Sequence, residues 1–220
     1  MKLANISLSV LTVLLASSPA MSADLTVQGQ LITSQGKLNS EKAEFIDPLT
    51  GAKVSEKSDG KADTITAPGA GVNLQYKLND DLRLGGGVAW IEYNGDKDNA
   101  DYSDLSASVN ATYDFFKQDA FSLYGLGGVS YHMVDPKDQK EEGLKVTMKS
   151  ADLLNYDLGV GGRYEVASNV NLGLSYRYSD TLAKGSIDAS SAIGTESLKT
   201  TFKDVSLQQN ELIASVGYSF

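Results

Sequence analysis

The sequence has no cysteine, only 4 prolines and a single histidine among its 220 residues. Without cysteine, neither a disulfide framework nor a thiolate metal site can form. Basic residues are also in deficit, because 19 lysines and arginines face 28 acidic residues and leave a formal net charge of −9. A protein that binds nucleic acid needs a basic face for the phosphates, so nucleic acid is excluded as a partner.

Long hydrophobic runs are almost absent as well. The one continuous apolar run covers residues 8–16, with Lys2 before it and several small residues after it. The run is shorter than the roughly 17 to 25 residues that a membrane-spanning helix needs. A positive residue, a short apolar stretch and small residues together form a secretory signal peptide. We therefore expect residues 1–23 to be removed on export, and residues 24–220 to form one mature domain.

What the sequence does contain is alternation. From Leu25 onward, apolar and polar residues alternate at period two, which predicts β-strands with one apolar face and not amphipathic helices. The 21 glycines and 11 tyrosines fit the same interpretation. The mean hydropathy of −0.20 does not argue against a membrane location, because averaging hides alternation. Eight segments carry the pattern: residues 25–31, 70–78, 82–90, 105–113, 121–131, 154–164, 170–178 and 212–220.

The connections between these segments alternate in length. Polar stretches follow the first, third, fifth and seventh segments, and short turns follow the second, fourth and sixth. Outer-membrane barrels have this asymmetry, with short periplasmic turns and longer external loops. A soluble β-sandwich, the alternative, has no reason to sort its loops by end and needs polar residues on its outer face. We predict an all-β fold, an eight-stranded antiparallel up-and-down transmembrane β-barrel.

The C-terminal segment carries a more specific pattern. It alternates apolar residues and ends on an aromatic, and in this it resembles the signal by which the barrel-assembly machinery recognises outer-membrane proteins. Two further stretches, residues 121–131 and 157–178, look like the strands of eight-stranded barrels of the OmpA, OmpX and Ail type. The residues that resemble the assembly signal are Leu212, Ala214, Val216, Tyr218 and Phe220.

This resemblance implies a protein of the Gram-negative outer membrane, in contact with membrane lipid and lipopolysaccharide. Because small barrels with a filled lumen are commonly monomeric, we expect a monomer. It implies that the protein acts through external loops, as an adhesin or colonisation factor that contacts host-surface molecules, or as a barrel that stabilises the surface. The loops concerned are mainly residues 33–62, 133–150 and 180–204. A narrow channel for small solutes is the alternative, and a lipid A-modifying enzyme is a weaker one.

A barrel of eight strands has an interior that side chains just fill. Charged residues on the predicted inner face must therefore be paired, because an unpaired buried charge is very costly. We expect them to form a salt-bridge plug and not an open pore. The six residues are Arg83, Arg163, Arg177, Asp114, Asp157 and Glu211.

The remaining motifs predict no cofactor, catalytic or metal site. The glycine-rich stretches lack the spacing of a dinucleotide-binding loop and lie within strands, so no cofactor is expected. His132 has no serine two residues later, because position 134 is valine, and we interpret it as a bystander near a loop. No catalytic residue is predicted. The acidic residues 96, 98, 101 and 104 do not match a calcium loop and predict a solvated acidic surface without a metal.

Overall fold

The computed structural model describes residues 25–46, 50, 52–57, 63–95, 101–141, 144–193 and 196–220. The expected signal peptide, residues 1–23, lies outside these residues. Within the described ranges, no helix is long and apolar enough to span a membrane.

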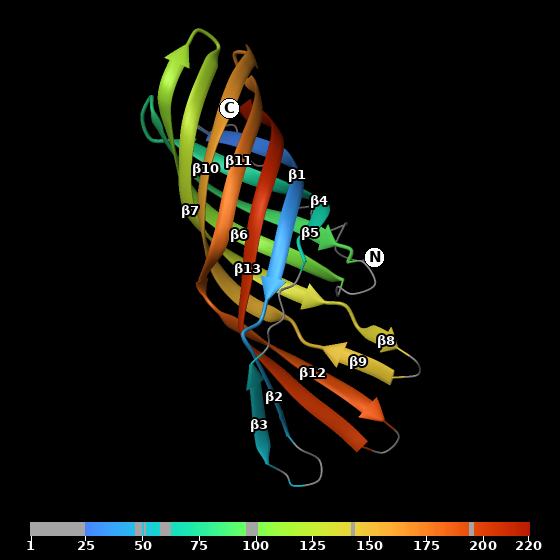
Figure 1. The fold of residues 1–220 in the computed structure, drawn as a ribbon. Coiled ribbons are helices and arrows are strands. Elements are labelled where there is room, and N and C mark those ends of the chain that lie inside the picture. Colours follow the sequence, from blue (N-terminus) through green and yellow to red (C-terminus); the bar gives the residue numbers. More distant parts are fainter. Residues whose placement is uncertain are drawn as a thin grey trace.

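Eight strands form a closed antiparallel ring, as predicted from the alternation (Figure 1). The ring closes where the first strand pairs with the last, from Thr26 opposite Ser219 to Asn39 opposite Ser206. In ring order the strands are β1 (Leu25–Asn39), β4 (Ile65–Lys77), β5 (Leu82–Tyr93), β6 (Tyr102–Gln118), β7 (Phe121–Pro136), β10 (Ala151–Ala167), β11 (Val170–Ala183) and β13 (Glu196–Ser219).

The outer wall of the ring is apolar. Leu31 on β1 and Val109 on β6 are 71% and 65% exposed, which is unusual for aliphatic side chains. Aromatic residues lie towards both margins of this surface, with Trp90 near one end of β5 and Tyr113 and Tyr164 near the other end of the barrel. Such a band of exposed apolar side chains with aromatic margins fits contact with lipid.

Short turns join the strands at one end of the ring. Between β4 and β5, the Asn79 side chain accepts hydrogen bonds from the backbone N–H groups of Asp81 and Leu82, at 3.0 and 2.8 Å. Between β6 and β7, Asp119 has a φ of 50°, a left-handed conformation that Asp tolerates in turns. By the rule for outer-membrane barrels, this end faces the periplasm.

The opposite end differs from the prediction of polar loops. Three of the four long connections form strands, which project from the barrel as a second sheet (Figure 1). We call this the outer sheet, and its strand order is β3-β2-β13-β12-β9-β8. The added strands are β2 (Lys42–Ile46), β3 (Lys53–Lys57), β8 (Gln139–Glu141), β9 (Leu144–Met148) and β12 (Gly185–Ile193).

The last strand belongs to both sheets. Its C-terminal part pairs with β1 and β11 in the ring, and its N-terminal part pairs with β2 and β12 in the outer sheet. The change falls at Asp204, which has a φ of 54°, next to the register shift between Gly185 and Ser186 on β12. A bulge of this kind bends a strand and increases its twist. One continuous strand therefore carries the barrel wall outward into the outer sheet.

We predict that Val109→Arg destabilises the barrel by about 2–4 kcal/mol, because a cation replaces an apolar side chain near the middle of the lipid-facing band. Equilibrium unfolding in urea with lipid vesicles measures the loss. The matched control is Ser190→Arg on the exposed surface of the outer sheet, which should change stability by no more than about 0.5 kcal/mol. Equal effects of the two changes would contradict the lipid-facing assignment.

Candidate functional site

The periplasmic half of the lumen holds a cluster of two arginines and one carboxylate. Asp114 on β6 is fully buried and forms ion pairs with Arg83 on β5 and with Arg163 on β10, the latter at 3.6 Å. The guanidinium of Arg163 also lies 5.1 Å from the ring centroid of Tyr124, a cation–π contact. Lys117, at the periplasmic end of β6, approaches the same carboxylate at 3.7 Å. These contacts join β5, β6 and β10 across the lumen near the periplasm.

A second ion pair lies further along the lumen, where Arg177 on β11 donates to Glu211 on β13. Asp157 on β10, the last of the six predicted lumen residues, accepts a hydrogen bond from Ser130 at 3.0 Å. The structure thus places five of the six charged residues in ion pairs. It places the sixth in a hydrogen-bond network that the sequence analysis missed.

That network, which we call the central network, is centred on His132. The imidazole Nδ1 lies 2.9 and 3.0 Å from the two carboxylate oxygens of Asp104, and Nε2 lies 2.9 Å from the hydroxyl of Ser130. Gln209 donates to Asp104 at 2.9 Å and to the hydroxyl of Tyr93 at 2.8 Å. The network therefore joins β5, β6, β7, β10 and β13 inside the lumen.

Two sequence interpretations are wrong at this point. His132 is not a bystander near a loop, and Asp104 is not part of a solvated acidic surface, because both side chains are buried. The sequence contained a signal for both. Asp104 shares the alternation of the polar face of β6, and His132 that of Ser130 on β7, so each points inward once the predicted strand is extended by one residue.

The contacts Asp104–His132–Ser130 follow the order of a hydrolase triad. Ser130 is only 3% exposed, however, and its hydroxyl lies 3.0 Å from Asp157, a carboxylate that competes with the imidazole for the hydroxyl proton. A nucleophile needs both a base that takes its proton and a path for the substrate. The described geometry buries the serine and gives the imidazole a competitor for its proton, so it argues for a structural network.

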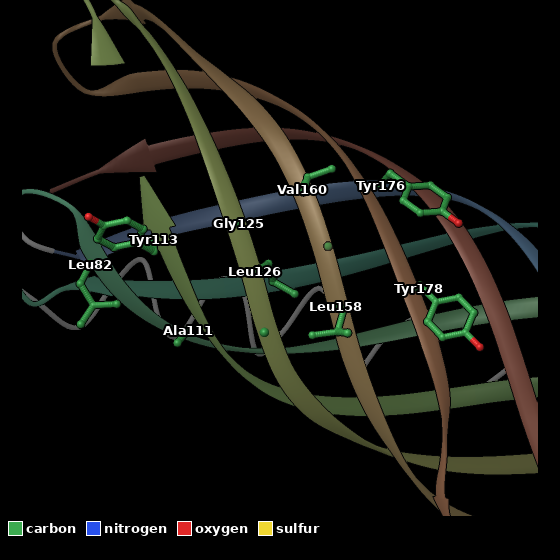
Figure 2. Close-up of a pocket in the computed structure, with 11 residues that line it drawn as sticks. Leu82, Ala111, Tyr113, Gly125, Leu126, Leu158, Val160, Tyr176 and Tyr178 are labelled. Carbon is green, nitrogen blue, oxygen red and sulfur yellow. The ribbon is translucent and has the colours of Figure 1, made fainter. Parts of the chain in front are cut away.

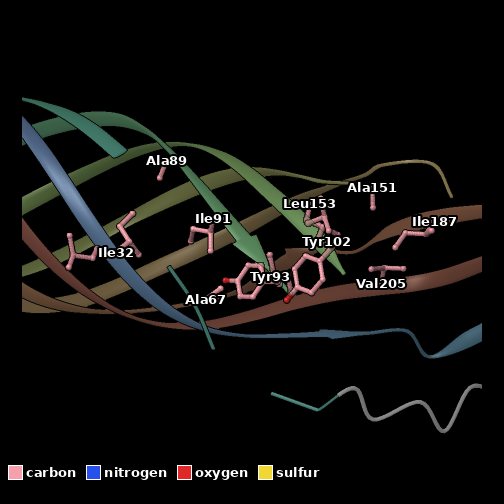
Figure 3. Packing of buried hydrophobic residues seen from close by; sticks show 13 residues of the cluster. Ile32, Ala67, Ala89, Ile91, Tyr93, Tyr102, Ala151, Leu153, Ile187 and Val205 are labelled. Carbon is pink, nitrogen blue, oxygen red and sulfur yellow. The ribbon is translucent and has the colours of Figure 1, made fainter. Parts of the chain in front are cut away.

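Above the central network, the external half of the lumen is filled by apolar side chains, which we call the plug (Figure 3). The rings of Tyr93 and Tyr102 stack with centroids 4.4 Å apart. Their neighbours Leu153, Val134 and Leu207 are at most 1% exposed. The sequence analysis predicted that salt bridges alone fill the lumen, and it did not predict this apolar layer. Because these side chains are buried against one another, the plug shields the lumen on its external side.

The plug continues into the outer sheet. Ile187 on β12 and Val205 on β13 belong to the same buried cluster, and Phe202 and Met148 pack against it. On the surface of the outer sheet, ion pairs link neighbouring strands and the residues beside them. They are Lys53–Glu44 at 2.8 Å, Lys203–Glu44 at 2.9 Å, Lys42–Asp204 at 3.2 Å, Lys149–Asp188 at 3.5 Å and Lys184–Glu41.

Glu44 is the most heavily paired acid of the outer sheet. Hydrogen bonds from Lys53 and Lys203 hold the pKa of Glu44 below the ordinary value for a glutamate. Single exposed ion pairs contribute little to stability, but a carboxylate shared by two strands restricts both. Lysines of the outer sheet are thus partners of acids on neighbouring strands.

The predicted acidic surface holds no metal site in the part of the chain that is described. Asp101 accepts a hydrogen bond from the backbone N–H of Gly95 at 2.8 Å, and Asp104 lies in the lumen. Residues 96 and 98 lie outside the described ranges. Among the described side chains, no group of three or more potential ligands could hold a metal ion.

The lipid-facing wall contains a hollow of about 600 Å³ (Figure 2). Its floor consists of residues without large side chains, Ala111, Gly125 and Gly127. The outer positions of both glycines open onto free space. Leu158 and Val160 form one wall. This lining is apolar, and at this height of the barrel it faces the membrane interior.

A closed ring of eight strands with an apolar outer wall and a filled lumen defines a transmembrane β-barrel. Residues 8–220 match the family described as outer membrane protein beta-barrel domain, and the chain belongs to this family. It is a protein of the outer membrane, as the resemblance implied. No curated protein sequence matches the chain.

Solved structures show the same fold. Neisserial surface protein A is 20% identical, with a TM-score of 0.55, over 90% of this chain and 98% of that one. The outer membrane protein OprG from Pseudomonas aeruginosa is 18% identical, with a TM-score of 0.57, over 89% of this chain and 95% of that one. At these identities the likeness concerns the barrel and leaves the role of this chain open.

We predict that Arg177→Met destabilises the barrel by about 3–5 kcal/mol, because Glu211 is then a buried charge without its partner. Adding Glu211→Gln should recover part of the loss. The control is Lys149→Met, whose exposed ion pair with Asp188 contributes at most about 1 kcal/mol. Urea unfolding of the variants measures these differences, and equal stability of Arg177→Met and the native protein would contradict the assignment.

We predict that Lys203→Gln raises the pKa of Glu44 towards its ordinary value, because one of two hydrogen bonds to the carboxylate is lost. The contribution of Glu44 to the outer sheet is present above the ordinary carboxyl pKa and is lost as the pH falls through the lowered pKa. Carbon NMR of the Glu44 carboxyl group during an acid titration checks the shift. Lys149→Gln, which acts on Asp188, should leave Glu44 unchanged.

Proposed function

We propose that this outer-membrane barrel acts as a surface recognition protein, an adhesin or colonisation factor whose binding element is the outer sheet. The observation that carries the proposal is that three of the four external connections form one ordered sheet continuous with the barrel. A preorganised surface loses less conformational entropy on binding than separate flexible loops do.

The filled lumen supports the same proposal because it argues against the alternative, a narrow channel for small solutes. Transport of small solutes needs a continuous polar path, and the plug with the central network fills the external half of the lumen. A narrow channel is therefore the weaker candidate. A lipid A-modifying enzyme would need its catalytic group at the lipid-facing wall, whereas the one histidine of the chain points into the lumen.

The partners in biogenesis and in the membrane follow from the outer wall. Leu212, Val216 and Tyr218 lie on the lipid-facing side of the last strand, each about half exposed or slightly more. Phe220 packs edge-on against Tyr218, with ring centroids 5.1 Å apart. We propose that this strand, with Ala214 in the same alternation, is read by the barrel-assembly machinery, and that lipopolysaccharide surrounds the external margin.

We predict that replacing the β2–β3 hairpin with a short glycine–serine connection reduces adhesion to cultured host-cell monolayers by about tenfold or more. The change removes one side of the outer sheet and leaves the ring intact. Heat-modifiable gel mobility verifies the fold, and protease treatment of whole cells verifies display. The control is Asp80→Asn in a periplasmic turn, which should adhere like the native protein.

Two outcomes would contradict the proposal. One is unchanged adhesion by the hairpin variant together with correct display. The other is steady single-channel conductance of the native protein in planar bilayers, which would favour the channel.

A further inference from the structure

The hydrogen bonds around His132 contain one proton more than a neutral imidazole supplies. Nδ1 faces both carboxylate oxygens of Asp104, which only accept, so Nδ1 must donate. Ser130 has a single hydroxyl proton and two contacts, an oxygen of Asp157 at 3.0 Å and Nε2 at 2.9 Å. An ionised carboxylate only accepts, so both contacts are hydrogen bonds only when the hydroxyl donates to Asp157. The contact of 2.9 Å between Ser130 and Nε2 then needs a proton on Nε2 as well.

We propose that His132 is a proton-operated latch. While both ring nitrogens carry a proton, it ties β6, β7 and β10 together beneath the plug, and the loss of one proton loosens the external end of the barrel. The proposal concerns the barrel itself and does not depend on what the outer sheet binds.

Charged groups from several strands surround the imidazole, so its protonation state changes the balance of charge in the lumen. Asp104 comes from β6, Asp157 from β10 and Glu211 from β13, and Arg177 on β11 is the one other cation of this part of the described lumen. Tyr93 from β5 joins through Gln209. The inward residues of β1 and β4 at this height, such as Ser34 and Ala67, carry no charge.

Three carboxylates thus face two cations while the imidazole is protonated, and face Arg177 alone once it is neutral. Repulsion between carboxylates at short range inside a protein is strong. One oxygen of Asp157 already has no hydrogen-bond partner among the described protein atoms. A neutral imidazole would also take the Ser130 proton and leave Asp157 with no donor.

The route from the latch to the plug is short. Gln209 bridges Asp104 and the hydroxyl of Tyr93, and the ring of Tyr93 stacks on Tyr102 in the plug. Ser34 on β1 holds the same Tyr93 hydroxyl at 2.6 Å. A change at His132 therefore reaches the side chains that close the lumen through three hydrogen bonds, from His132 to Asp104, from Gln209 to Asp104 and from Gln209 to Tyr93.

The first test is nitrogen NMR of the imidazole in lipid nanodiscs, on a protein without a histidine tag. The chain contains one histidine, so the signals need no assignment. We expect two protonated ring nitrogens at about pH 7, where an ordinary imidazole is mostly neutral. In Asp157→Asn, Ser130 is free to donate to Nε2, and we expect one protonated nitrogen at the same pH.

The second test is amide hydrogen exchange at Tyr93, Tyr102, Leu153 and Leu207 between about pH 5 and about pH 9. After correction for the intrinsic rate, we expect exchange at these plug residues to rise by about tenfold or more as His132 loses its second proton. Asp157→Asn should remove this pH dependence, because it removes one of the opposed carboxylates. Asp188→Asn on the outer sheet should retain it.

Three results would overturn the latch. The first is a single protonated ring nitrogen in the native protein at about pH 7, which would place the extra proton on Asp157. The second is a doubly protonated imidazole with plug exchange that does not change as it titrates. The third is the same pH dependence in Asp157→Asn as in the native protein, with heat-modifiable mobility showing that the variant is folded.

Discussion

Closure of the sheet is the constraint on which the rest of the structure depends. In hydrocarbon, an unpaired backbone N–H or C=O group costs several kcal/mol, so a sheet that crosses a membrane has to end on itself. Here β1 and β13 meet that requirement over fourteen residue pairs. With eight strands, closure also fixes a bore that is just wide enough for side chains. The lumen is therefore a core, and its residues are chosen by packing and pairing.

The lumen solves this packing problem in layers. Near the periplasm, Asp114 compensates two arginines, and in the middle, hydrogen bonds connect carboxylates, an imidazole and an amide. Towards the outside, aromatic and aliphatic side chains take over. A polar side chain shifted into the apolar layer would lose its hydrogen-bond partners, and an apolar side chain shifted into the polar layer would leave partners unsatisfied. Each strand is therefore held at one register relative to its neighbours. The order of the layers along the lumen thus fixes the register of the strands as well as filling the interior.

The sequence predicted the ring because lipid imposes a strict rule on every second residue, and the rule is visible at Leu212, Ala214, Val216 and Tyr218. It did not predict the outer sheet, where alternation such as Ile187 and Ala189 against Asp188 and Ser190 spans only one hairpin and lies among many polar residues. Nor did it predict the contact of Asp104 with His132, because these residues are 28 positions apart and meet only once the register of β6 and β7 is fixed. Periodicity reports which side a residue faces, and pairing depends on register.

The shared strand β13 has a consequence for the order of folding. Its N-terminal part needs β2 and β12 as neighbours, whereas its C-terminal part closes the ring against β1. The pairings with β1 and β2 join residues near the two ends of the chain, whereas the hairpin with β12 is local, and contacts of long sequence separation form slowly. Closure of the ring and attachment of the β2–β3 hairpin therefore depend on the same slow encounter, so completion of the outer sheet is tied to closure of the barrel.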